Sequence, residues 1–178
     1  MSRSPRFVFG YGSLLWRPGF PYRERVVARL RGMSRRFWQG SPDHRGSPDA
    51  PGRVVTLIDE PGSECWGAAY RVDASLWSEI AARLDERESG GFERVEVLLE
   101  VEGGSQDVEP ALVYVARAGN PNFLGPASLP AIGAQVRSAS GRSGTNLDYV
   151  LRLAAALQEI GKCDEHVFAL AEHLATGA

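Results

Sequence analysis

The sequence has 178 residues and a formal net charge of -2, and it is 43% hydrophobic and 24% charged. This length suits one domain that buries roughly 70% of its unfolded surface, and the composition excludes a disordered or fibrous chain. We therefore expect a single globular domain over residues 1–178.

The first predicted elements are strands. Residues 6–11 form a short apolar and aromatic run that ends in a glycine-containing turn, which is typical of a strand. Residues 26–38, 53–58 and 65–72 are partly β-branched and aromatic, and clusters of Pro, Gly and Asp separate them. We expect these four segments to form strands of one sheet.

A helix and a further pair of strands follow. Within residues 74–87 apolar side chains recur every four positions behind Asp73, which predicts a helix with Asp73 as its N-cap. Residues 94–101 mostly alternate apolar and polar side chains, as a half-buried strand does. Residues 108–117 are the expected partner of that strand.

The last third of the chain is predicted to be helical. Apolar periodicity indicates helices near residues 127–139, 146–160 and 164–175. Gly161 is the expected C-cap of the second of these helices, and Asp164 the N-cap of the third. A strand-rich core followed by helices predicts an α+β domain whose sheet can close into a barrel.

Nothing in the sequence predicts a membrane or secreted protein. No apolar run approaches the roughly 20 residues that cross a bilayer. Residues 1–16 lack both a long apolar region and a small-residue cleavage site. We therefore predict a cytoplasmic protein with no membrane partner.

The distribution of charge bears on anionic partners. Residues 1–53 contain 11 arginines and three carboxylates, and residues 35–38 interleave arginines with aromatic side chains, as nucleic-acid-binding surfaces do. The chain is net acidic, however, and it uses arginine in place of nearly all lysine. This composition instead favours a solvated surface position for most of the arginines. We predict no nucleic-acid partner, although a few arginines could bind substrate carboxylates.

A loop with two glycines follows the first predicted strand. Residues 10–15 begin like a dinucleotide fingerprint, but Leu15 occupies the third glycine position and no amphipathic helix follows. A dinucleotide site is therefore excluded. Two interpretations remain: a plain tight turn, or a loop whose backbone N–H groups converge on a small anion.

Patterns of metal-binding and nucleophilic residues are weak. His44, His166 and His173 are scattered, and Cys163 with His166 forms only half of a metal motif. We predict surface or capping roles for the histidines and no metal site. Cys65 lies beside a tryptophan in a predicted strand, which is typical of a buried and inert cysteine.

Acidic residues cluster on and just after the predicted helix 74–87. Glu79 and Glu86 are seven positions apart and share one helix face, whereas Glu88 stands at the helix end beside two glycines. A carboxylate at that point can turn into a cleft. The pattern alone nevertheless favours a solvated face for the charged run 85–88.

Several long blocks of the sequence match a known family. Residues 9–16, FGYGSLLW, are similar to an FGYGSLIW loop, and residues 84–92, LDERESGGF, to an LDxREkGGY segment. These blocks resemble the ChaC family of glutathione-specific γ-glutamylcyclotransferases. The resemblance covers nearly the whole chain, with further blocks at 20–22, 35–41, 43–46, 51–57, 66–70, 120–126, 143–146 and 164–166, and with Tyr149.

The resemblance implies a γ-glutamylcyclotransferase-like mixed β-barrel with flanking helices. It also implies a lyase that cleaves glutathione into 5-oxoproline and cysteinylglycine without a cofactor or a metal. Glu88 is then the general acid/base, and Glu79 and Tyr114 match supporting positions. Phe92 stands where the family often has tyrosine. The implied γ-glutamyl-binding loop consists of Gly10, Tyr11, Gly12, Ser13, Leu14 and Leu15.

Two other functions stay open beside glutathione cleavage. The same cyclisation could act on other γ-glutamyl amino acids or amines. Alternatively, the chain could bind γ-glutamyl groups without turnover, and the presence of both Glu88 and the intact loop 10–13 argues against that function.

Overall fold

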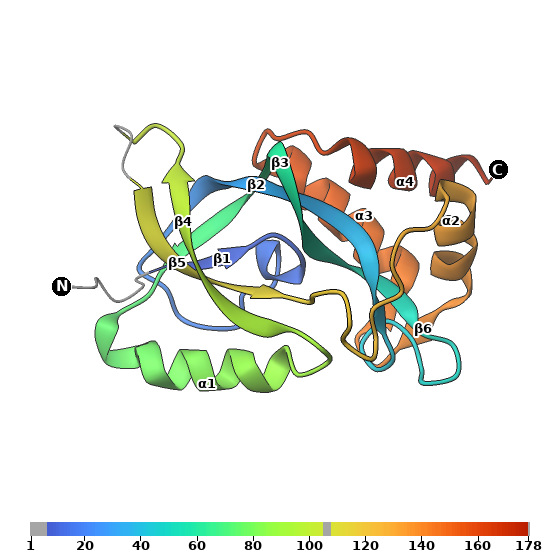
Figure 1. The fold of residues 1–178 in the computed structure, drawn as a ribbon, viewed down its shortest axis with the longest axis horizontal. Helices are drawn as coiled ribbons and strands as arrows, with labels where there is room; N and C mark the ends of the chain where they lie inside the picture. Colours follow the sequence, from blue (N-terminus) through green and yellow to red (C-terminus); the bar gives the residue numbers. More distant parts are fainter. Residues whose placement is uncertain (1–6, 105–107, 178) are drawn as a thin grey trace. The chain divides into compact units, whose positions relative to one another are not determined.

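The computed structural model describes residues 7–104 and 108–177. The chain groups into two compact units, the first made of Met1–Ser34 and Asp59–Val115 and the second of Arg35–Ile58 and Ala116–Ala178. Figure 1 traces the chain through the elements of both. The single domain over 1–178 stays a prediction.

Five strands form a closed barrel with the strand order β1-β3-β2-β4-β5. Its strands are β1 (Phe7–Gly10), β2 (Glu24–Ser41), β3 (Gly52–Arg71), β4 (Glu93–Val101) and β5 (Val108–Val115). Strand β1 pairs antiparallel with β3 but parallel with β5, and β4 pairs antiparallel with both β2 and β5. The predicted α+β class with a closed barrel is confirmed.

The barrel strands follow their sequence pattern. On β4, Leu99 is fully buried while its neighbour Leu98 is 63% exposed, because successive side chains of a strand point to opposite faces. Phe7 and Phe9 of β1 and Val113 of β5 complete a part of the buried core, each at most 1% exposed. The β4–β5 pairing confirms the strand pair predicted for residues 94–101 and 108–117.

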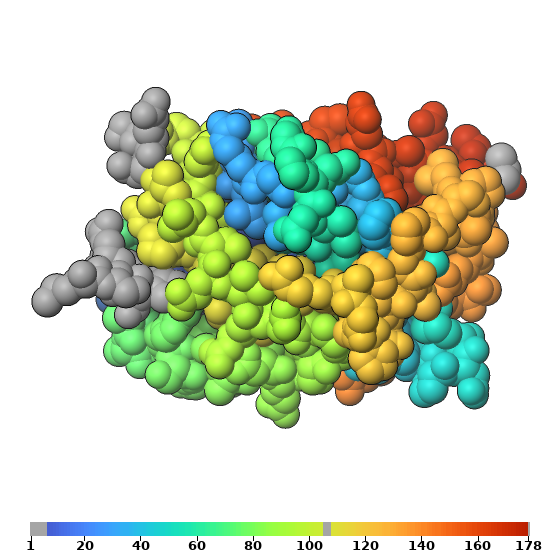
Figure 2. All heavy atoms as spheres, in the orientation of Figure 1, coloured from blue at the N-terminus to red at the C-terminus, as the bar shows by residue number. Residues whose placement is uncertain are grey.

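Helix α1 (Trp77–Arg87) follows β3 through the short 3-10 helix η2 (Ala74–Leu76). The Asp73 side chain accepts a hydrogen bond from the first turn, as predicted for an N-cap. Ile80 and Leu84 are buried. In the space-filling view, the green atoms of α1 lie along the surface of the unit (Figure 2).

The second unit contains three helices that pack on one another, α2 (Leu129–Ser138), α3 (Asn146–Glu159) and α4 (Glu165–Thr176), drawn in orange to red in Figure 1. A short hairpin of β6 (Ser140–Gly141) and β7 (Gly144–Thr145) precedes α3. Among the residues that the structure describes, no helix is long and apolar enough to cross a membrane.

The predicted N-cap of α4 is confirmed, whereas the C-cap of α3 is Ile160, one position before the predicted Gly161. Gly161 has φ +70°, and the Lys162 N–H donates a 3.0 Å hydrogen bond to the Leu157 carbonyl, as in a left-handed C-terminal cap. The Asp164 side chain accepts a 3.1 Å hydrogen bond from the Val167 N–H and thereby caps α4.

One predicted boundary is wrong. Residues 53–58 and 65–72 were expected to be separate strands, but β3 continues from Gly52 to Arg71. Gly62 lies in the intervening segment with φ +89°. Glycine adopts a positive φ without the steric cost that a Cβ imposes, so the chain can pass through this conformation within the strand.

Candidate active site

The glycine-containing loop begins where β1 ends and lies against β3. Gly10 pairs with Ala68 of β3, and a Cβ on Gly10 would lie 2.8 Å from the Leu14 Cβ. A Cβ on Gly67 would lie 2.3 Å from the Gly10 carbonyl oxygen. Both glycines are therefore needed for the close approach between the loop and the strand.

The loop contains a tight turn, one of the two interpretations of the sequence, in the form of the 3-10 helix η1 (Ser13–Leu15). The Leu15 N–H donates to the Gly12 carbonyl at 2.9 Å. The buried Tyr70 hydroxyl donates to the Leu14 carbonyl at 2.5 Å, and burial raises the pKa of that hydroxyl. Tyr70 thus remains a donor at neutral pH and fastens the turn to β3.

Arg87, the last residue of α1, connects the helix to this loop. Its Nη2 donates to Ser13 Oγ at 3.0 Å. Its Nη1 donates to the carbonyls of Arg17 and Pro18, at 2.8 and 3.0 Å. The loop at the end of β1 and the end of α1 are therefore held together within the first unit.

Glu88 occupies the C-cap position of α1, and its N–H donates to the Leu84 carbonyl at 2.8 Å. Its carboxylate lies 3.7 Å from Arg87 Nε, and its side chain is 18% exposed. A solvated surface charge would be more exposed. The structure thus brings Glu88 next to Arg87, which in turn contacts Ser13.

Tyr114 is the buried link between the loop, β5 and α1. Its hydroxyl donates to Asp85 Oδ1 at 2.6 Å, and the Tyr11 hydroxyl donates to the Tyr114 carbonyl at 2.6 Å. Burial first, and then the hydrogen bond to Asp85, raise the pKa of Tyr114, with a further contribution from the negative charge of Glu88. Tyr114 therefore stays protonated and holds α1 through Asp85.

Glu79 lies apart from these contacts. Its side chain is 64% exposed on α1 and lies 3.8 Å from Arg83, one turn further along the helix. Its ion-pair partner is Arg83 on the same helix, whereas Glu88 reaches the loop 10–15 through Arg87. The supporting role predicted for Glu79 stays a prediction.

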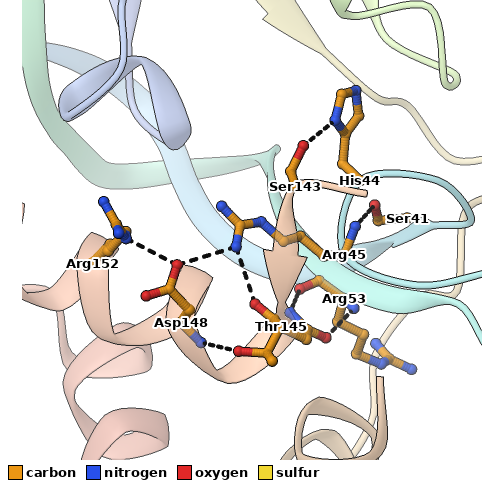
Figure 3. Close-up of polar contacts among 9 residues, drawn as sticks. Ser41, His44, Arg45, Arg53, Ser143, Thr145, Asp148 and Arg152 are labelled. Carbon is orange, nitrogen blue, oxygen red and sulfur yellow. Dashed lines mark hydrogen bonds and ion pairs between the residues drawn. The ribbon is translucent and has the colours of Figure 1, made fainter. Parts of the chain in front are cut away.

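A second polar cluster lies in the second unit, at the start of α3 (Figure 3). Arg45 donates to the Thr145 carbonyl at 3.1 Å and lies 3.3 Å from Asp148. The Arg53 N–H donates to the Asn146 side chain at 2.7 Å. The side chain of Arg45 and the backbone of Arg53 thus bind the start of α3.

His44 and Ser143 point toward each other in the same cluster, with Nδ1 2.7 Å from Oγ (Figure 3). Arg142 Nη2 lies 3.1 Å from His44 Nε2, and a guanidinium can only donate. The Asp43 carboxylate, which can only accept, lies 3.7 Å from the same Nε2. His44 is thus held by polar contacts at both of its ring nitrogens.

The remaining histidine and cysteine positions are structural. His166 was predicted to have a surface or capping role, but it is half-buried and its Nε2 accepts a 3.0 Å hydrogen bond from the Phe37 N–H. Cys65 is buried, as predicted, and Cys163 is exposed. Residues 7–104 and 108–177 contain no group of three or more His, Cys, Asp and Glu side chains that could hold a metal ion.

Comparison with known proteins agrees with this arrangement. A family model described as ChaC-like protein matches residues 6–176. The chain belongs to the ChaC family. A human protein named glutathione-specific gamma-glutamylcyclotransferase 1 is 44% identical over 174 residues, which cover 96% of this chain and 78% of that protein. A fission yeast protein named glutathione-specific gamma-glutamylcyclotransferase is 34% identical over 181 residues. The match covers 92% of this chain and 89% of that protein.

A solved structure extends the comparison to the fold. The crystal structure of a yeast γ-glutamyl cyclotransferase specific to glutathione matches with a TM-score of 0.88 and 28% identity. The match covers 98% of this chain and 99% of that chain. The γ-glutamylcyclotransferase-like mixed barrel predicted from the ChaC resemblance is thereby confirmed.

Two functional candidates in this ChaC-family chain escaped sequence reasoning. Arg87 stands between Glu86 and Glu88 in a charged run, so its pattern was that of a solvated face. Asp85 belongs to the same run. The one available signal was that both residues fall inside the ChaC-like block 84–92, which also contains Glu88.

Proposed function

We propose that this chain is a glutathione-specific γ-glutamylcyclotransferase that converts glutathione into 5-oxoproline and cysteinylglycine. The observation that carries the proposal is the 44% identity, over 96% of the chain, to a human protein of that name. A second support is the position of Glu88, which neighbours Arg87 and through it the loop 10–15.

The substrate supplies its own nucleophile in this reaction. The α-amine of the γ-glutamyl unit attacks the γ-carbonyl, a C–N bond closes the five-membered lactam, and the bond to the cysteine nitrogen breaks. Holding the substrate in the folded conformer can contribute roughly 7 to 11 kcal/mol, because well-oriented intramolecular reactions reach effective molarities of about 10⁵ to 10⁸ M. Positioning is therefore the larger part of the catalysis.

We assign the γ-glutamyl-binding role to the loop 10–15. Of the backbone N–H groups of residues 11–14, those of Ser13 and Leu14 open the turn η1, and the first donors of a helical turn have no partners inside that turn. Such donors can bind the α-carboxylate of the substrate. A donor in the same loop can also stabilise the negative charge that develops on the γ-carbonyl oxygen.

We assign the proton transfers to Glu88. The substrate amine is an ammonium at neutral pH, so a base must remove a proton before the amine can attack. The leaving amine must gain a proton, and the same carboxylic acid can donate it. A positioned acid/base contributes about 10² to 10⁴-fold to the rate, and no covalent enzyme intermediate is needed.

The proposal includes no cofactor, no metal and no nucleic-acid partner, because the reaction needs only a folded substrate and a proton carrier. The cytoplasmic location predicted from the sequence belongs to the same proposal. Tyr114 takes a supporting role, since its hydroxyl holds Asp85 on α1 three residues before Glu88.

The test is an assay of the purified protein with glutathione in the presence of a metal chelator. We expect 5-oxoproline and cysteinylglycine in equal amounts, and we expect neither the chelator nor dialysis to lower the rate. Release of free glutamate would identify a hydrolase and contradict the proposal. Equal turnover of γ-glutamyl-alanine would replace glutathione specificity with a broader cyclotransferase activity, and binding without turnover would identify a binding module.

A further inference from the structure

We propose that Arg87 is a positioning residue that couples the Ser13 hydroxyl to the Glu88 carboxylate, an inference that rests on the function proposed above. The guanidinium hydrogen-bonds Ser13 Oγ at 3.0 Å through Nη2, and its Nε lies 3.7 Å from Glu88 Oε1. Ser13 belongs to the substrate loop and Glu88 is the acid/base. One side chain therefore contacts both halves of the site.

The loop is shaped to receive this guanidinium. Arg17 and Pro18 both direct their carbonyl oxygens at Nη1. Gly19 follows with φ +74°, and a Cβ there would lie 3.2 Å from Arg87 Nη1. Glycine accepts this positive φ, and its missing Cβ leaves room for the guanidinium. The segment thus admits the guanidinium and supplies two of its acceptors.

The contact also determines what Ser13 can do. A hydroxyl has one donor and two acceptor positions, and a guanidinium can only donate. Because Ser13 Oγ accepts from Arg87, its own O–H proton remains available to donate to another group. We infer that this proton is directed at a substrate carboxylate or at the carbonyl oxygen under attack.

The same cation acts on Glu88. The two side chains are 25% and 18% exposed, so solvent screens the attraction only in part. A positive charge within about 4 to 6 Å favours the ionised form of a carboxylate, which is the form that accepts the ammonium proton. Arg87 therefore keeps Glu88 ready as a base while it holds the loop that receives the substrate.

The planar fork of the guanidinium makes this role specific for arginine. Three hydrogen bonds leave Arg87 toward Ser13, Arg17 and Pro18, and a lysine ammonium is a single point charge that cannot span these acceptors. A lysine at position 87 retains the charge beside Glu88 but loses the grip on the loop. The two parts of the role can therefore be separated by substitution.

The experiment compares Arg87→Ala and Arg87→Lys with Arg83→Ala, a control on the same helix whose side chain is 62% exposed. We expect kcat/KM for glutathione to fall by about 10²-fold in Arg87→Ala, the size of a loss from misplaced reacting groups. The acidic limb of its pH–rate profile should also move to higher pH. Arg87→Lys should have the pH–rate profile of the wild type but a kcat/KM as low as that of Arg87→Ala. Arg83→Ala should match the wild type in both measurements.

Two further measurements separate positioning from general damage to the fold. Guanidinium ion at millimolar concentration should raise the rate of Arg87→Ala several-fold and leave that of Arg83→Ala unchanged. Ser13→Ala combined with Arg87→Ala should lose less activity than the product of the single losses, because the two residues act as one unit.

The outcomes distinguish this inference from the proposed function. Normal wild-type turnover with an unaltered rate and pH profile in Arg87→Ala would overturn the role of Arg87 alone. Strictly multiplicative losses with no response to guanidinium would overturn it as well. Absence of 5-oxoproline from the wild-type protein would overturn the proposed function and this inference together.

Discussion

The hydroxyl of Tyr114 on β5 donates a 2.6 Å hydrogen bond to Asp85 on α1. This contact spans 29 positions of the chain and lies three residues before Glu88. Tyr114 is 4% exposed. The bond therefore attaches the end of α1, and Glu88 beyond it, to the barrel.

Removal of this hydroxyl should destabilise the protein. Tyr114→Phe loses a hydrogen bond to a charged acceptor, so we expect the free energy of unfolding in urea to fall by about 1.5 kcal/mol. The exposed Tyr22, changed to Phe, is the matched control and should stay within about 0.5 kcal/mol. A loss of turnover in Tyr114→Phe without any loss of stability would instead indicate direct contact with the substrate.

The raised pKa of Tyr114 predicts a loss of stability in alkali. The unfolded tyrosine releases its proton near pH 10, whereas the folded one keeps it to a higher pH. The stability that this group contributes is thus present below about pH 10 and declines above it. Urea unfolding at pH 9 and pH 10.5 should reveal a smaller decline in Tyr114→Phe than in the wild type.

Substitution of Glu88 tests the general acid/base. Glu88→Gln keeps the size of the side chain but cannot carry the proton, so turnover should fall by at least about 10²-fold while glutathione binding survives. Glu86→Gln, two positions earlier and exposed, is the matched control and should retain its rate. If Glu88→Gln kept more than a tenth of the activity while Glu79→Gln lost it, the base would have to be sought at Glu79.

The close packing of the loop 10–15 is tested at Gly10. An alanine there would place its Cβ 2.8 Å from that of Leu14, and overpacking of this kind costs about 1 to 3 kcal/mol. We expect Gly10→Ala to lower both the melting temperature and the turnover. Gly104→Ala, whose Cβ would meet nothing closer than 3.4 Å, should alter neither. Equal behaviour of the two variants would contradict the close packing of the loop.

His166 predicts a loss of stability in mild acid. Burial first, and then the positive charge of Arg36, lower the pKa of His166, against an opposing contribution from Asp164 and with a smaller lowering by Arg35. The unfolded histidine takes up a proton near pH 6.5, before the folded one does. Stability is therefore complete above about pH 6.5 and declines as the pH falls.

The measurement is urea unfolding at pH 7.5 and pH 5.5. In the folded protein, the Phe37 N–H donates a hydrogen bond to Nε2 of His166. Protonation of Nε2 would turn this acceptor into a donor, so two N–H groups would face each other. His166→Gln should be less stable than the wild type at pH 7.5. Its free energy of unfolding should nevertheless fall less than that of the wild type between pH 7.5 and pH 5.5. His173→Gln should keep the pH dependence of the wild type. An unchanged slope in His166→Gln would refute this assignment.

Local sequence patterns determined most element boundaries. Asp164 and Gly161 mark the ends of α4 and α3 because a cap depends on residues within one helical turn. The half-buried face of β4 was predicted for a similarly local reason. Apolar and polar side chains alternate along this strand, and successive side chains of a strand point to opposite faces. Family-like blocks determined the barrel fold and singled out Glu88.

Only the tertiary structure decided which of these residues meet. The parallel pairing of β1 with β5 closes the barrel between segments about 100 positions apart, and no local pattern encodes that pairing. Arg87 and Ser13 are 74 positions apart and are joined by a side-chain hydrogen bond. In the sequence, Arg87 and Glu79 are both members of a charged helix. Side-chain direction relative to the barrel separates them, because one points into the loop and the other toward water.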